Sequence, residues 1–207
     1  MKIGFFGGSF NPPTNAHIDL AKTAIEACKL DKLIFVPMGD LYNKKNLAKA
    51  KDRYSMLEIA CRGIKNIEVS DLEIKVNKEL HTIDAFRLIE DAYKNNDNWF
   101  LMGADNFIKL LNWKESENLS KYNYIVFERG DVNLKEYIKN NEMLKNTKVQ
   151  IIENNKYKYK SATEFRNLLK GDIKEQNIVP NEVLEFIKTN HIYQREQDEE
   201  NNKEDNK

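Results

Sequence analysis

The stretch GGSFNPPTNAH, from Gly7 to His17, decides the fold because it separates two different patterns of apolar residues. Residues 2–6 before it are mostly apolar and aromatic, which is typical of a buried strand. After it, apolar residues recur at helical spacing between Ile18 and Cys28. The glycines and prolines of the stretch itself exclude regular secondary structure. The sequence therefore predicts a strand, a sharp turn and a helix in this order.

The same alternation of strands and helices continues along the chain. Further strands are predicted at residues 32–36, 67–69, 99–102, 124–127 and 149–152. Helices are predicted near residues 54–61, 86–93, 105–111, 134–141, 163–170 and 181–190. Strands that alternate with helices imply parallel pairing through crossover helices. We therefore expect an α/β fold with a Rossmann-like, doubly wound parallel sheet, in a single domain over residues 1–193.

The composition excludes several classes of protein. The chain has 207 residues, and 41% of them are hydrophobic, which is enough to build a core. The 33 Lys and Arg residues balance the 33 Asp and Glu residues, and a net charge of zero argues against a nucleic-acid partner. Because no apolar run reaches the roughly 18 residues of a membrane span, we also expect no membrane partner.

The cysteines and the last residues complete this outline. Cys28 and Cys61 stand among apolar residues without the spacing of metal ligands, so we expect buried, reduced thiols and a cytoplasmic location. Residues 194–207 are almost wholly charged or amide-bearing, and such a segment is predicted to be a disordered tail. The sequence leaves the oligomeric state open and is compatible with a homo-oligomer.

The turn from Gly7 to His17 is also the strongest candidate for a ligand site. At the carboxyl end of a parallel strand it would lie where such folds bind ligands. Gly7 and Gly8 allow the backbone to approach a ligand closely, and the start of the following helix offers N–H groups to an anion. Thr14 and His17, one helical turn apart, are expected to reach one phosphate together. For His17 taken alone, a structural role beside a capping Thr14 remains an alternative.

Two common phosphate motifs do not fit this stretch, because neither a P-loop lysine nor the pattern G-x-G-x-x-G is present. The stretch instead resembles the signature GG[ST]F-x-P-x-[HT]-x-G-H of the nucleotidyltransferase superfamily. Ala16 replaces the usual glycine, and its methyl group is expected to crowd the nucleotide. Members of the superfamily join ATP or CTP to a phosphorylated acceptor and release pyrophosphate. The resemblance implies a catalytic His17 and an ATP site that includes Gly7, Gly8, Ser9, Phe10, Thr14 and His17.

A second segment, YKSATEFR at residues 159–166, resembles the ISSTxxR motif of the same superfamily. It implies that Ser161, Thr163 and Arg166 form a second phosphate site at the start of a helix, with Arg166 in a catalytic role. Ser161 followed by Glu164 also fits an ordinary capping box. Capping alone would account for Ser161, but a capped helix does not require Arg166.

A third segment narrows the resemblance. LMGAD, residues 101–105, is similar to the IIGAD segment of the bacterial nicotinate mononucleotide adenylyltransferases, in which a tryptophan soon follows, as Trp113 does here. The resemblance implies that Gly103 and Asp105 bind ATP, and that Asn112 and Trp113 border the nicotinate ring. Without the resemblance, Asp105 is interpreted as a helix cap and Trp113 as a core residue.

Two further segments concern the acceptor and the phosphates. HTID, residues 81–84, resembles the SYTxDT segment of that family and implies that Thr82 binds the acceptor. After the second predicted strand the family usually has Pro-Pro-His-Lys, and here Lys44, or alternatively Lys45, would supply a catalytic cation. The resemblance runs in one order from residue 1 to about residue 193.

Taken together, the resemblance implies transfer of the adenylyl group of ATP to nicotinate mononucleotide, a step of NAD biosynthesis. The implied partners are ATP and a pyridine mononucleotide. Mg²⁺ is the implied cofactor, bridged mainly by phosphate oxygens and water, so that no metal-ligating side chain is expected. Two alternatives stay open. One is another nucleotidyltransferase with phosphopantetheine, a sugar phosphate or a glycerol phosphate as acceptor. The other is a non-catalytic, nucleotide-binding regulatory domain.

Overall fold

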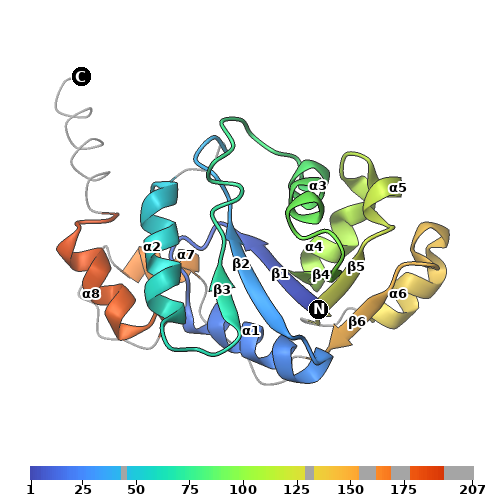
Figure 1. Cartoon of the computed structure of the whole chain (residues 1–207), viewed down its shortest axis with the longest axis horizontal. Helices are drawn as coiled ribbons and strands as arrows, with labels where there is room; N and C mark the ends of the chain where they lie inside the picture. Colours follow the sequence, from blue (N-terminus) through green and yellow to red (C-terminus); the bar gives the residue numbers. More distant parts are fainter. Residues whose placement is uncertain (43–45, 129–132, 154–161, 169–177, 194–207) are drawn as a thin grey trace.

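A six-stranded parallel sheet forms the centre of the computed structural model (Figure 1). The structure describes residues 1–42, 46–128, 133–153, 162–168 and 178–193. The strands lie in the order β3-β2-β1-β4-β5-β6, and each neighbouring pair is parallel. Their bounds are Lys2–Gly8 for β1, Lys32–Pro37 for β2, Ile67–Val69 for β3, Asp97–Gly103 for β4, Asn123–Phe127 for β5 and Val149–Ile152 for β6. The predicted α/β fold is thereby confirmed.

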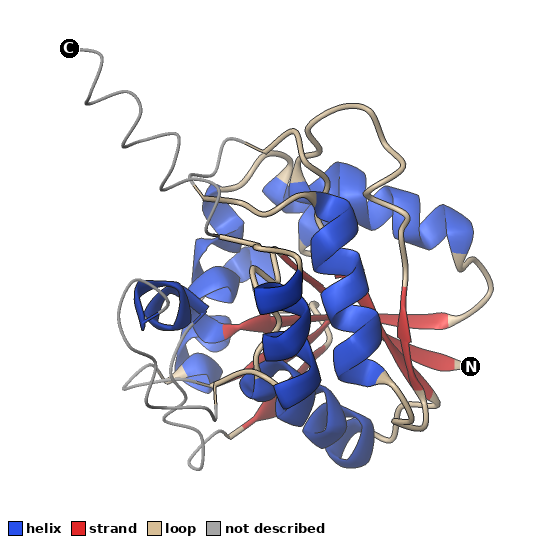
Figure 2. Cartoon of the chain, turned by 90° about the vertical axis from the view of Figure 1, so that its left-hand side faces the viewer, coloured by secondary structure: helices blue, strands red, loops and turns tan. Residues whose placement is uncertain are grey.

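Helices cover both faces of the sheet (Figures 1 and 2). On one face pack α1 (Asn15–Cys28) and α2 (Ala50–Cys61), and on the other α3 (Thr82–Ala92), α4 (Ala104–Lys109), α5 (Ser116–Leu119) and α6 (Leu134–Asn140). Successive residues of a strand point to opposite faces. Ile34 and Phe35, neighbours in β2, are accordingly both buried but belong to different apolar clusters. This burial on both faces explains why the strands are continuous apolar runs.

β1 lies at the point where the order of the strands reverses. The chain passes from β1 outwards to β2 and β3, returns through α3 to β4 on the other side of β1, and then continues outwards again. At such a point the loops after the two central strands diverge and leave a crevice at the carboxyl ends. Those ends are Gly7 and Gly8 in β1 and Gly103 in β4. The fold therefore places the turn after β1 beside the GAD segment.

The last helices form a third apolar cluster, separate from the sheet. α7 (Ala162–Leu168) and α8 (Asn181–Thr189) contribute Phe165, Val183 and Ile187, which pack around Met56 of α2. Among the described residues, this cluster has no buried member in common with the clusters on the two faces of the sheet. Figure 1 shows α8 on the outer side of α2.

The structure adds short elements that the sequence does not predict. They are α5 and the single 3₁₀ turns Leu110–Asn112 and Glu142–Leu144, each too short to show a helical period. No helix within the described ranges is both long and apolar enough to cross a bilayer. Residues 194–207 lie outside the described residues, so the disordered tail and the domain boundary at residue 193 stay predictions.

Candidate functional site

Two cavities meet at the carboxyl ends of β1 and β4. The first, of about 190 Å³, is lined mainly by apolar atoms, and the second, of about 310 Å³, more by polar ones. We term them the apolar cavity and the polar cavity. Gly7, Gly8 and Asn106 line both. Ligands bound in the two cavities would therefore meet at the turn after β1.

The polar cavity collects most of the predicted ATP-site residues from separate parts of the chain. Its lining includes the predicted residues Gly7, Gly8, Ser9, Phe10, His17, Gly103 and Asp105. Ala162, the first residue of α7, lines it as well. The structure thus brings the turn after β1, the GAD segment and the start of α7 to one cavity.

Gly7 keeps the turn open for a ligand. A Cβ atom at this position would meet no other atom within 4 Å, whereas a Cβ atom at Gly4 in the same strand would lie 2.6 Å from the side chain of Leu30. The missing side chain at Gly7 therefore serves no packing purpose and leaves free space at the cavity. Ala16, by contrast, is 6% exposed and lines neither cavity, and the expected crowding of the nucleotide by its methyl group stays a prediction.

His17 is held by the residue that precedes its helix. Its Nδ1 atom lies 2.9 Å from the backbone nitrogen of Thr14 and 2.9 Å from the hydroxyl oxygen of Thr14. A backbone N–H can only donate, so Nδ1 accepts, and the neutral ring carries its proton on Nε2. The ring lines the polar cavity and lies edge-on to Phe10, with ring centroids 5.2 Å apart. In its neutral form His17 is therefore a hydrogen-bond donor through Nε2.

Thr14 and the start of α1 differ from the expectation. Thr14 is 2% exposed and lines neither cavity, so its hydroxyl serves to orient His17. The N–H of Asn15, the first residue of α1, donates to the carbonyl oxygen of Ile178 at 2.9 Å. One backbone N–H group at the start of α1 is thus already hydrogen-bonded within the protein. Of the two residues only His17 lines the polar cavity, and their joint contact with one phosphate stays a prediction.

Arg166 lies beside the turn after β1, and its guanidinium is hydrogen-bonded to other groups of the protein. Its Nη1 donates to the carbonyl oxygen of Asn11 at 2.5 Å, and its Nη2 donates to the hydroxyl of Thr163 at 3.2 Å. Arg166 and the exposed Thr163 do not line the polar cavity, so their contact with a phosphate stays a prediction. Ser161 and Lys44 lie outside the described residues, and their roles stay predictions too.

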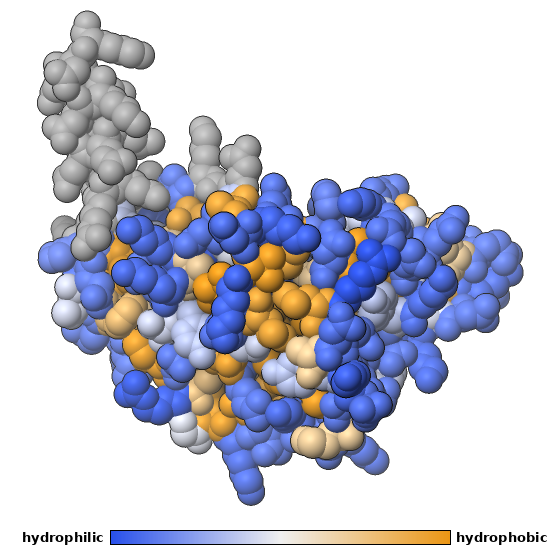
Figure 3. Space-filling model, turned by 45° about the horizontal axis from the view of Figure 1, so that its top comes forward, coloured by the Kyte–Doolittle hydropathy of each residue, from blue (hydrophilic) through white to orange (hydrophobic). Residues whose placement is uncertain are grey.

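The apolar cavity receives two of the three predicted acceptor residues. Thr82, at the start of α3, and Trp113 line it together with Phe86. Asn112 is exposed and lines neither cavity, so the structure does not bring it to the acceptor. The backbone N–H of Trp113 donates to the carbonyl oxygen of Leu110 at 3.1 Å. Figure 3 turns this end of the molecule forward and shows apolar residues gathered between two hydrophilic regions.

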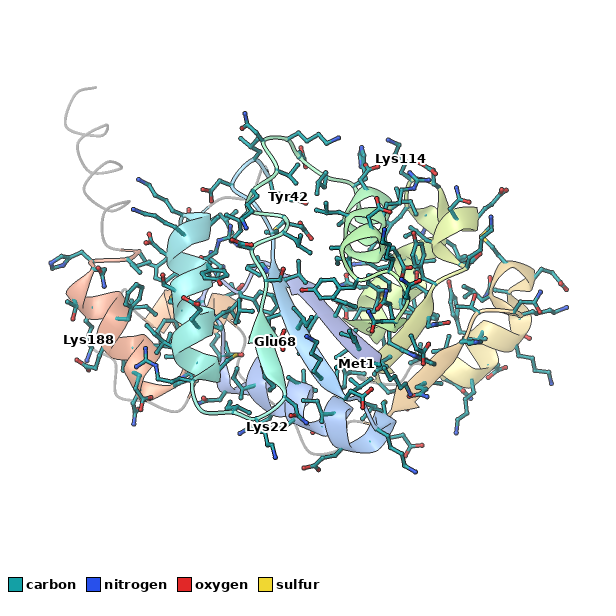
Figure 4. All side chains as sticks on the ribbon, viewed as in Figure 1. Met1, Lys22, Tyr42, Glu68, Lys114 and Lys188 are labelled. Atoms are coloured by element: carbon teal, nitrogen blue, oxygen red, sulfur yellow. The ribbon has the colours of Figure 1, made fainter. Side chains whose placement is uncertain are left out.

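Sequence reasoning missed Tyr42 and Glu73, which also line the apolar cavity. Tyr42, on the loop after β2 (Figure 4), donates its hydroxyl to Oε2 of Glu73 at 3.0 Å. Glu73 is only 8% exposed; burial raises its pKa, while the Tyr42 hydroxyl and the charge of Arg53 lower it. Burial and the carboxylate of Glu73 in turn raise the pKa of Tyr42. No local pattern marks either residue, because the loops after β2 and β3 meet only in the folded chain.

Known proteins share this arrangement of segments. The family model described as cytidylyltransferase-like matches residues 5–168, which include the turn after β1, the GAD segment and α7. This chain belongs to the cytidylyltransferase-like family.

Individual members of the family are similar over most of the chain. The "Probable nicotinate-nucleotide adenylyltransferase" of Fusobacterium nucleatum is 34% identical over 93% of this chain and 100% of its own length. The protein of the same name from Clostridium acetobutylicum is 30% identical over 93% of this chain and 98% of its own. A solved structure of Plasmodium falciparum nicotinic acid mononucleotide adenylyltransferase complexed with NaAD covers 93% of this chain and 97% of its own, with a TM-score of 0.76 and 22% sequence identity. This last likeness shows the same fold.

In this cytidylyltransferase-like chain a buried arginine ties together the two loops beside the cavities. Arg53 of α2 is 0% exposed, and its Nη1 donates to the carbonyl oxygen of Ser9 at 2.9 Å. Its Nη2 donates to the carbonyl oxygen of Met38 at 2.7 Å, and its Nε to that of Ala48 at 2.7 Å. Sequence reasoning missed this role, although a signal exists: Arg53 stands four residues before Leu57, on the buried face of the helix.

Proposed function

We propose that this family member transfers the adenylyl group of ATP to nicotinate mononucleotide and releases pyrophosphate, forming nicotinate adenine dinucleotide in NAD biosynthesis. The observation that carries the proposal is the meeting of the polar and apolar cavities at Gly7 and Gly8. A nucleotide in the polar cavity and a pyridine ring in the apolar cavity would bring their phosphates together at this turn. The names of the curated relatives support the same reaction.

The chemistry requires one bond to form and one to break. A phosphate oxygen of the mononucleotide attacks the α-phosphorus of ATP in line, and the bond from that phosphorus to the oxygen bridging the β-phosphate breaks. Such a transfer needs no covalent nucleophile, so the protein contributes positioning and stabilisation of charge. His17 supplies a hydrogen-bond donor through Nε2, and Lys44 and Arg166 are the predicted cations.

The apolar cavity suits the pyridine ring of the acceptor. Trp113, Phe86 and Phe100 offer flat apolar surfaces to an aromatic ring. Thr82 adds a hydroxyl. Lys114 lines neither cavity, but it directly follows Trp113 and adds a positive charge at the same end of the molecule as Tyr42 (Figure 4). A cation near the ring favours a carboxylate substituent over an amide. We therefore infer a preference for nicotinate over nicotinamide mononucleotide.

We propose that Mg²⁺ enters the site with ATP. Among the described residues there is no group of three or more His, Cys, Asp and Glu side chains that could hold a metal ion. Asp105 is the single carboxylate in the described lining of the polar cavity, which suits an ion that keeps phosphate oxygens and water as its other ligands. When bound, the ion would neutralise charge on the phosphates.

We also place the reaction in the cytoplasm. Cys28 and Cys61 are free and buried, and burial raises the pKa of both thiols, that of Cys61 to about 12. Buried thiols that stay protonated are unreactive, which supports a protein that keeps its cysteines reduced.

Pyrophosphate release with a panel of acceptors tests the proposed reaction. The protein is given ATP and Mg²⁺ with nicotinate mononucleotide, nicotinamide mononucleotide, phosphopantetheine or glycerol phosphate in turn. We expect the highest kcat/KM with nicotinate mononucleotide, above that with the amide, because the positive charge of Lys114 next to Trp113 attracts a carboxylate and not a neutral amide. Release with phosphopantetheine or glycerol phosphate alone would assign another nucleotidyltransferase activity. ATP binding without release from any acceptor would indicate a regulatory domain.

A further inference from the structure

Asn11 stands at a junction of four segments beside the polar cavity. It is 5% exposed and belongs to the lining. Its Nδ2 donates to the carbonyl oxygen of Asn46 at 2.5 Å, and its Oδ1 accepts the backbone N–H of Ala48 at 3.0 Å and the hydroxyl of Tyr193 at 2.8 Å. Its own carbonyl oxygen accepts Arg166. Because both lone pairs of Oδ1 are used by protein donors, the Asn11 side chain fixes the shape of the turn.

Tyr193 reaches Asn11 from a part of the chain that is remote in sequence. Residues 178–193 are anchored by the third apolar cluster, in which Ile187 of α8 packs with Met56 of α2. That cluster is separate from the two clusters on the faces of the sheet. The position of the Tyr193 hydroxyl therefore depends on the packing of α8 on α2.

The same segment, residues 178–193, also contacts the turn where α1 begins. The carbonyl oxygen of Ile178 accepts the N–H of Asn15 at 2.9 Å. Tyr193 and Ile178 thus fasten the turn at Asn11 and again at Asn15, and His17 follows within the next helical turn. Two contacts from one segment fix both ends of the stretch between β1 and His17.

We propose that Tyr193 is a positioning residue of the nucleotide site, which sets the turn after β1 through Asn11. The inference rests on the proposed function in taking ATP as the nucleotide. Loss of the hydroxyl leaves Oδ1 of Asn11 with one partner fewer, so the turn is held less firmly. Neither Tyr193 nor Asn11 lines the apolar cavity, and the effect therefore falls on ATP and spares the acceptor.

Tyr193→Phe removes this hydroxyl and nothing else. Tyr137→Phe is its matched control, because Tyr137 donates to the carbonyl oxygen of Ile108 at 2.8 Å and lines neither cavity. In steady-state kinetics we expect KM for ATP to rise about three- to tenfold in Tyr193→Phe, the loss of one ordinary hydrogen bond, with KM for nicotinate mononucleotide unchanged. Tyr137→Phe should keep both KM values. Similar melting temperatures in the two variants would separate positioning from a general loss of stability.

A double-mutant cycle tests whether the effect passes through Asn11. In a protein that already carries Asn11→Ser, adding Tyr193→Phe should change KM for ATP less than twofold, because the two residues share one interaction. Full additivity of the two substitutions would contradict the proposed route. A KM for ATP in Tyr193→Phe equal to that of the control, or an equal rise of both KM values, would overturn the inference.

Calorimetric binding of a non-hydrolysable ATP analogue separates this inference from the proposed function. A parent protein that binds the analogue but releases no pyrophosphate with nicotinate mononucleotide contradicts the proposed reaction. Tyr193 is then judged by the analogue alone, which should bind about three- to tenfold more weakly to Tyr193→Phe than to Tyr137→Phe. A parent that does not bind the analogue contradicts both.

Discussion

The polar and apolar cavities share a wall at Gly7 and Gly8, yet they are built in different ways. The polar cavity takes nearly half of its described lining from one stretch, residues 7–17, and the rest from several separate elements. The apolar cavity is lined by side chains from separate segments, among them Tyr42, Glu73 and Trp113. The contrast teaches that one turn can supply the largest single share of a phosphate site, whereas the pocket for a ring takes its side chains from loops that meet only in the assembled fold. Changes on the two sides should therefore be separable in kinetics.

His17→Ala should give the largest effect, and the effect should fall on the polar cavity. Loss of one donor to charge that develops in the transition state typically lowers kcat about 10²- to 10³-fold. We expect a modest fall in the melting temperature, because the backbone N–H of the buried Thr14 loses its acceptor, Nδ1 of His17. Steady-state kinetics and thermal melting measure the two quantities. His81→Ala, at an exposed residue that lines neither cavity, is the control. A folded His17→Ala protein with the parental kcat would refute the assignment.

Trp113→Ala should have the second largest effect, and the effect should fall on the apolar cavity. Removal of an aromatic surface that packs on a flat ring typically costs about 1–3 kcal/mol, so KM for the mononucleotide should rise roughly ten- to hundredfold. KM for ATP should stay within about twofold of the parental value. Trp113→Phe keeps an aromatic face and should recover most of the loss. If Trp113→Ala raised both KM values alike, the two cavities would not act separately.

Glu73→Gln tests the apolar cavity through the pH dependence of the protein's stability. Burial raises the pKa of Glu73 above its ordinary value of 4.5, so the folded protein favours the protonated carboxyl. The contribution of this group to the free energy of unfolding is therefore fully present below about pH 4.5 and is lost as the pH rises through the raised pKa. Glutamine has no such titration, and the variant should gain stability relative to the parent across this window. Urea unfolding at several pH values measures the difference, and a pH-independent difference would contradict the shift.

Removal of residues 194–207 should have the smallest effect and should disturb neither cavity. The segment contains no apolar residue with which to pack on the domain. We expect kcat, both KM values and the melting temperature of the protein ending at Tyr193 to match those of the full chain. A clear loss of stability in the shortened protein would show that the tail binds the domain.

The sequence predicts the fold well because its elements are marked locally. Each strand is a short apolar run, and in α1 the buried residues Ile18, Ala21 and Ala24 recur at the helical period. Elements such as α5 escape prediction because four residues do not complete a readable period. The same locality makes part of the polar cavity predictable, since a single stretch supplies nearly half of its described lining.

The rest of the site could not be predicted, because its residues meet only through tertiary packing. Tyr42 and Glu73 come from loops after different strands, and Tyr193 reaches Asn11 across most of the length of the chain. The sequence also cannot show that Thr14 is turned inward, because spacing along a helix does not tell which of two neighbouring side chains faces the ligand. Such residues can be identified only from the distances between them in the folded molecule.

The third apolar cluster has a consequence for how the protein behaves on heating. A segment that packs on the rest of the domain through a small core of its own can open at a lower free energy than the whole molecule. As the temperature rises, α8 should separate from α2 while the six strands are still paired, and Tyr193 then leaves Asn11. Heat inactivation would thus begin as a reversible local opening below the global transition, with the temperature limit of activity set by the last helix rather than by the sheet.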